Sequence, residues 1–152
     1  MAGVFFLATP APITLTTGAG PLTWVQLIAA SSHRVLLHQM DVSFNGITAA
    51  DPPVLLELRV QTTAGSGGSS LTLVKDNPSD DETLQTTALN TITSTPTSTD
   101  IRWQDYVHTQ TGIILPFPRP IFIPGGTRLG LQWTTGTVTG TVKAAIVMRC
   151  EE

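Results

Sequence analysis

Charged side chains are scarce in this chain. Lys, Arg, Asp and Glu make up 12% of its 152 residues, whereas an ordinary soluble domain carries about 25%. Thr, Ser, Gln, Gly and Pro fill most of the polar positions instead. Hydroxyl and amide groups cost less to desolvate than charges when another chain covers them. The composition therefore favours a protein whose outer faces are partly interfaces, with a role in assembly.

Four further shortages exclude classes of function or location. The net charge is -3 and the 8 Lys and Arg residues are scattered, so we expect no binding of nucleic acid. Cys150 is the single cysteine, which rules out an internal disulfide and a paired-cysteine metal site. No apolar run approaches the roughly 18 residues that span a bilayer, so we expect no membrane partner. The opening segment lacks the basic residues of an export signal, so synthesis in a cytoplasm is expected.

What the chain does contain is period-two alternation of apolar and polar residues, the pattern of half-buried strands. It is clearest in residues 34–45, 54–61, 128–133 and 142–149. In the first segment the pattern places five residues on one face: Leu36, His38, Met40, Val42 and Phe44. In the second, Glu57 and Arg59 lie on the face opposite the apolar residues, side by side and, we expect, in solvent.

Weaker strand patterns occupy residues 22–29, 70–74, 84–93, 101–108 and 113–117, giving about eight to ten strands and no long helix. This predicts an all-β fold, an antiparallel β-sandwich with a jelly-roll-like arrangement. We predict a single domain over residues 1–152, with residues 1–10 as an N-terminal arm or edge strand. The polar connections 76–84 and 94–100 are expected to cross between the two sheets.

Residues able to perform catalysis are present but form no recognisable constellation. Ser32 precedes His33, yet adjacency in sequence is not the geometry of a nucleophile and its base. His33 and His38 are placed on opposite faces of an extended segment, which excludes joint metal coordination. The acidic residues within 76–82 lack the spacing of a calcium-binding loop. We therefore expect no enzymatic activity, no metal and no cofactor.

The second half of the chain contains an ordered set of residues: Trp103, His108, Gln110 and Gly112, then Pro116-Phe117-Pro118, then Ile123-Pro124-Gly125-Gly126-Thr127-Arg128-Leu129. Upstream, a Gly/Ser-rich tip precedes the connection Val74-Lys75-Asp76-Asn77-Pro78. With these features in this order, most of the chain resembles the capsid decoration (cement) proteins of tailed phages. The resemblance implies a structural protein of the virion. It would form a homotrimer on the capsid exterior at local threefold positions, bind the major capsid protein and stabilise the mature shell.

The apolar N-terminal segment is the candidate contact region under this resemblance. Val4, Phe5, Phe6 and Leu7 are its candidate contacts with the shell or with a neighbouring subunit. A terminal apolar segment is seldom exposed unless something covers it. An equally open alternative is that Val4, Phe6 and Ala8 complete a sheet within the same chain.

Trp103 and Tyr106 keep a second function open. Exposed aromatic rings beside amide and acidic side chains form the stacking platforms of sugar-binding proteins, and Gln104 and Asp105 lie between these two rings. Trp133, in contrast, continues an apolar face and is expected in the core. The alternative to a shell protein is therefore a glycan- or receptor-binding module of a phage fibre or surface complex.

Overall fold

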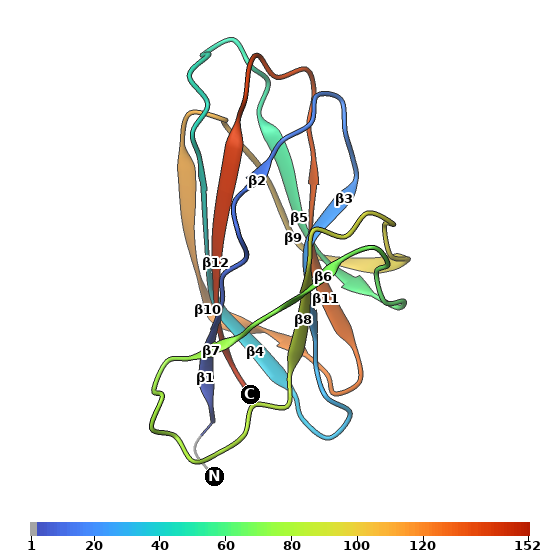
Figure 1. Ribbon diagram of the computed structural model, residues 1–152, viewed down its shortest axis with the longest axis vertical. Helices are drawn as coiled ribbons and strands as arrows, with labels where there is room; N and C mark the ends of the chain where they lie inside the picture. Colours follow the sequence, from blue (N-terminus) through green and yellow to red (C-terminus); the bar gives the residue numbers. More distant parts are fainter. Residues whose placement is uncertain (1–2) are drawn as a thin grey trace.

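Two antiparallel sheets pack face to face in the computed structural model, which describes residues 3–152 (Figure 1). Sheet A has the order β10-β4-β12-β1-β7, with β2 paired to β12. Its strands are β1 (Phe5–Ala8), β2 (Ile13–Thr14), β4 (Val35–Phe44), β7 (Val74–Lys75), β10 (Gly112–Ile123) and β12 (Lys143–Glu151). Sheet B has the order β6-β8-β3-β11-β5-β9. Its strands are β3 (Leu22–Ile28), β5 (Val54–Gln61), β6 (Ser69–Leu71), β8 (Thr87–Asn90), β9 (Ser98–Val107) and β11 (Arg128–Thr134).

The predicted all-β antiparallel sandwich is confirmed, since the described residues form strands and connections without a helix. In particular, residues 3–152 contain no helix that is long and apolar enough to cross a membrane.

The core lies between the sheets and comes from the inward-facing side chains of the long strands. The predicted inner faces of β11 and β12 are confirmed, because every member is buried: Leu129, Leu131, Trp133, Ala144, Ile146 and Met148. Phe6, Trp24 and Leu37 are among the largest fully buried side chains. Burial of each such side chain stabilises the fold by about 1.5–3 kcal/mol. The two sheets are therefore held together mainly by these inner faces.

The predicted face of β4 is wrong in its first half. Val35, Leu37, Met40 and Val42 are buried, whereas Leu36 and His38 are only half-buried. The reason is a β-bulge at His38: Gln39 pairs with Arg149 and Leu37 pairs with the next residue, Cys150. One extra residue in a strand reverses the alternation beyond it. His38 and Leu36 consequently lie on the outer face of sheet A.

The N-terminal segment is a paired strand inside sheet A, instead of a free arm or an edge strand. β1 pairs with β12 on one side and with the short strand β7 on the other. Val4, Phe6 and Ala8 are buried, so the alternative that they complete a sheet within the same chain is confirmed. Residues 1–2 of the predicted arm lie outside the described residues.

One predicted strand and one predicted connection differ from expectation. The expected strand over 70–74 is divided into β6 of sheet B and β7 of sheet A, so the chain crosses between the sheets at residues 72–73. The polar connection after β7 does return to sheet B, as predicted. The connection 94–100 does not cross, because β8 and β9 both belong to sheet B. It leads instead from one side of sheet B to the opposite edge.

The flanks of the sandwich are formed by two pairs of edge strands. β6 and β7 are the edges at one flank, and β9 and β10 are the edges at the other. Residues 108–111 join β9 to β10, and Figure 1 shows the two strands leaving this turn in different sheets. This second flank, which we call the β9–β10 flank, thus presents two long strands without a partner on their outer sides.

Candidate functional site

Ser32 and His33 form a local hydrogen bond at the surface. Ser32 Oγ and His33 Nδ1 are 2.8 Å apart, and both side chains are exposed. They line the rim of an open polar pocket of about 600 Å³ together with Arg34, Glu82 and Glu151. A nucleophile–base pair needs a third group that orients the imidazole through its other nitrogen. Within residues 3–152, no hydrogen bond reaches that nitrogen of His33, so the pair has the geometry of a surface turn.

The other histidines hold strands and loops in place. His38 Nε2 lies 2.9 Å from Glu151 Oε2, and the His38 ring stacks at a tilt on Phe5 with centroids 5.7 Å apart. His108 contacts the Ala49 carbonyl through Nε2. In the described part of the chain, no group of three or more His, Cys, Asp and Glu side chains is placed to hold a metal ion.

The acidic connection after β7 is organised around a lysine. Lys75 Nζ donates to the Asp80 carbonyl at 2.8 Å and also to the Glu82 carbonyl. Asn77 Nδ2 donates to Asp80 Oδ1 at 2.7 Å. The loop thus uses its backbone oxygens and one carboxylate to hold its own shape.

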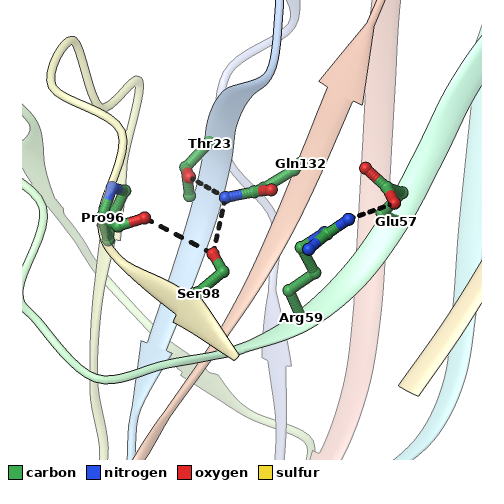
Figure 2. Close-up of polar contacts among 6 residues, drawn as sticks. All are labelled: Thr23, Glu57, Arg59, Pro96, Ser98 and Gln132. Carbon is green, nitrogen blue, oxygen red and sulfur yellow. Dashed lines mark hydrogen bonds and ion pairs between the residues drawn. The ribbon is translucent and has the colours of Figure 1, made fainter. Parts of the chain in front are cut away.

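A buried polar layer covers the outer face of sheet B. Its side chains are Thr23, Gln26, Gln61 and Gln132, all nearly inaccessible to solvent. Gln26 Nε2 donates to Gln61 Oε1 at 2.7 Å, and Gln61 Nε2 donates to Thr23 Oγ1 at 3.0 Å. Gln132 Nε2 donates to Thr23 and to Ser98 Oγ, as Figure 2 shows. The polar groups are buried because they satisfy one another.

This polar layer fastens loops over sheet B. Gln26 donates to the Thr63 carbonyl and accepts a hydrogen bond from the Gly65 N–H. Ser98 Oγ, which accepts from Gln132, lies just after Pro96 (Figure 2). Segments before β6 and before β9 therefore lie on the outer face of sheet B, and much of that face is already covered within the chain.

The prediction that Glu57 and Arg59 lie in solvent is wrong for Glu57. The ion pair exists, with Arg59 Nη2 2.7 Å from Glu57 Oε1 (Figure 2), but the Glu57 side chain is only 8% exposed. Strand β9 pairs with β5 and places Gln104 directly opposite Glu57. Side chains in opposite positions are neighbours on one face, so Gln104 limits the access of solvent to Glu57. The alternation of residues predicted correctly that Glu57 lies on the outer face of sheet B, but it could not show that neighbouring side chains bury it.

The outer face of sheet A is free of such a cover and has a different character. Register places Phe5 opposite Glu151, Glu151 opposite Leu36, and Leu36 opposite Phe122. Side chains directly opposite in antiparallel strands are neighbours on one face. Phe5, Leu36 and Phe122 therefore belong to one row across four strands, which we call the apolar row. Glu151, paired with His38, lies between Phe5 and Leu36 in this row. Phe5 and Phe122 are about half exposed, at 48% and 49%.

The four candidate contact residues, Val4 and the first three residues of β1, lie alternately on the inner and the outer face of sheet A. Val4 and Phe6 are buried in the core, so their side chains face away from any partner. Phe5 is exposed and Leu7 is half-buried on the outer face of sheet A. Both line a shallow depression of about 250 Å³ with His38 and Arg149. A partner that covers this face would touch Phe5 and Leu7.

Trp103 and Tyr106 do not form one stacking platform. Trp103 is half-buried and packs against the core, while Tyr106 is 66% exposed. Trp103 pairs with Leu58, an inward-facing residue, and Tyr106 pairs with Leu55 on the outer face. The two rings thus point to opposite sides of β9.

No known protein family, curated protein or solved structure matches this chain.

Two exposed apolar residues on β10 were missed at the level of the sequence, Ile114 and Phe122. The signal that identifies them is the proline spacing. Pro116, Pro118 and Pro120 lie within β10, and proline within a strand indicates a sheet edge or a bulge. On an edge strand, an apolar residue on the outer face has few neighbours to cover it. The two residues extend the exposed apolar surface from β1 to the far edge of sheet A.

Proposed function

We propose that this chain is a structural virion protein that binds the outside of a phage capsid as a homotrimer at local threefold positions. In this role it contacts the major capsid protein and stabilises the mature shell. The observation that supports the proposal is the contrast between the two outer faces. Loops of the same chain cover the part of sheet B around Gln26, whereas sheet A exposes the apolar row and an adjoining depression. Several exposed or half-buried apolar side chains on one face of a charge-poor protein are typical of an interaction site.

A trimer that uses three such faces would bind by avidity. Each copy contributes a weak contact, and once one contact has formed the others form at a high effective concentration. Binding only to the mature lattice stabilises that lattice by mass action. Hydroxyl and amide groups around the apolar row can add direct or water-mediated hydrogen bonds without the desolvation cost of charges.

The first test asks where the chain is found. Phage particles from the lysate that contains this protein are purified and imaged by cryo-electron microscopy, with mass spectrometry to identify the chain. We expect density for three copies at local threefold positions outside the shell. Particles that lack the chain, or that hold it inside the shell, would contradict the proposal.

A second test asks which face binds. Purified chain is added back to shells stripped of it, and Phe5→Asp is compared with the wild type. Half of a buried Phe contributes about 1 kcal/mol, so loss from three copies should weaken binding of the trimer roughly 100-fold. Ile47→Asp is the matched control, because Ile47 is exposed in the loop between β4 and β5 and lies away from the row. Equal binding by all three proteins would contradict a role for sheet A.

One observation favours the alternative of a glycan- or receptor-binding module. Tyr106 is exposed, and the carboxylate of neighbouring Asp105 accepts its backbone N–H at 2.7 Å. A single ring without Trp103 beside it is a small platform for a sugar. A glycan array on which the wild type binds and Tyr106→Ala does not would support this alternative over the shell protein.

A further inference from the structure

The β9–β10 flank holds most of the large apolar side chains that the described chain leaves exposed. There are seven such residues: Phe5, Ile47, Val74, Ile101, Tyr106, Ile114 and Phe122. The last four lie on β9 and β10. Ile114 is 74% exposed, although it belongs to a long strand. Isolated apolar residues on a surface are ordinary, but four exposed ones on two adjacent edge strands point to an interaction surface at this flank.

The inner side chains at this flank are also incompletely covered. Trp103 on β9 and Ile113, Leu115 and Phe117 on β10 pack against the core but remain half-buried. A partner at this flank would complete the burial of these core side chains. Interfaces that contain such core-like apolar side chains are typical of permanent association. This favours a second copy of the chain, available from folding onward, over a transient partner.

Charge indicates how two copies would meet. β9 contains Asp100, Arg102 and Asp105, a net charge of -1, and β10 contains Arg119 as its charged residue, a net charge of +1. A twofold contact of β9 on β9 would bring like net charges together. A contact of β10 on the β9 of the next copy brings opposite charges together. The charges therefore favour contact of β9 with the β10 of another copy. In the proposed trimer such contacts repeat head to tail and close into a ring.

The positions of the exposed residues fit this arrangement. Ile114 pairs with Asp41 and lies on the outer face of sheet A, while Tyr106 lies on the outer face of sheet B. Because β9 and β10 meet at one flank, Ile114 and Tyr106 lie beside that flank on opposite outer faces of the sandwich. Rotation about an axis beside the flank brings the Ile114 face of one copy against the Tyr106 face of the next.

The backbone of β10 opposes continuous sheet extension at this surface. The Thr111 carbonyl accepts from Phe44 N–H on β4, so the backbone groups of residues 112, 114 and 116 point away from β4. Proline at position 116 removes the outward N–H there. An added strand could form only a short ladder, so contact at this edge depends on side-chain packing.

We infer that copies of this chain meet head to tail at the β9–β10 flank, with Ile114 of one copy packed against Tyr106 of the next. The inference rests on the proposed function for the number of copies and adds the surface through which they associate. It leaves Phe5 and Leu7 on β1, which lies away from β10 in sheet A, where a shell can contact them.

Sedimentation velocity of the full chain tests the surface. We expect the wild type to sediment at three times the chain mass of 16.1 kDa, and Ile114→Asp and Tyr106→Asp to sediment as monomers. Both residues are exposed, so circular dichroism should show an unchanged fold. Val74→Asp is the matched control, because Val74 is exposed on β7 at the opposite flank, and it should remain a trimer. Trimers of both flank variants would overturn the inference while leaving the proposed function intact.

Cross-linking tests the head-to-tail geometry. Ile114→Cys and Tyr106→Cys chains are made separately, then unfolded, mixed, refolded and treated with a short bis-maleimide. Cys150 is buried and does not compete. We expect cross-linked pairs in the mixture and none in either variant alone. Cross-linking within a single variant would overturn the pairing of Ile114 with Tyr106, and a wild type that sediments as a dimer would overturn the head-to-tail ring. A wild type that is monomeric at all concentrations would overturn it too, and shell binding by that monomer would then decide the proposed function separately.

Discussion

Glycine is required at position 130 because Gln61 occupies the space where a side chain would begin. A Cβ on Gly130 would overlap the Gln61 amide, which is hydrogen-bonded to Gln26 and Thr23. We expect Gly130→Ala to lower the free energy of unfolding by about 1–3 kcal/mol, since displacing the amide leaves buried polar groups unpaired. Urea denaturation measures the loss. The same substitution in a Gln61→Ala background should cost much less, and an equal cost in both backgrounds would refute this explanation.

Cys150 is a probe of strand β12. Its side chain is 1% exposed, and burial raises the pKa of the thiol far above its ordinary value. Because the thiolate is the reactive form, the folded protein should not react with a thiol reagent at neutral pH. Labelling should occur only when β12 opens, at a rate that rises with denaturant. Rapid labelling that does not depend on denaturant would show that the strand is accessible in the native state.

At the scale of the element, β1 places a core residue and a surface residue next to each other. Phe6 is buried in the core, and Phe5 is half exposed on the outer face of sheet A. We expect Phe6→Ala to destabilise the fold by about 3–5 kcal/mol, and Phe5→Ala to cost roughly 1 kcal/mol or less. Chemical denaturation of the two variants measures the difference. Similar losses for both would mean that β1 does not alternate between core and surface.

Strands differ in how well alternation predicted them. β12 is paired on both sides and its inner residues follow period two as expected. β4 departs from the pattern at His38 because Pro116 and Ile121 of β10 pair with Gln39 and Leu37, leaving four residues of β10 opposite one of β4. A bulge that depends on a neighbour some 80 residues away along the chain leaves no signal in the local pattern.

At the scale of the whole molecule, association should change the dynamics of one flank and not the other. In the proposed trimer, backbone N–H groups of β9 and β10 should exchange with solvent at least about tenfold more slowly than in the dilute monomer, because the partner would limit local opening. The β6–β7 flank serves as the internal control and should be unaffected. Hydrogen exchange followed by mass spectrometry at two concentrations makes the comparison. An equal change in exchange rate at both flanks between the two concentrations would argue against association through β9 and β10.

Local properties of the chain determined the all-β class, the inner faces of β11 and β12 and the shortage of charge, because each depends on residue type or on period two along one strand. The tertiary structure decided which outer face is free. Gln26, Gln61 and Gln132 are polar residues of a type that is mostly exposed, yet loops distant in sequence bury them on sheet B. Phe5, Leu36 and Phe122 form one row only because four strands from different parts of the chain come into register. Burial and neighbourhood on a sheet are set by pairing between distant segments, which no local pattern contains.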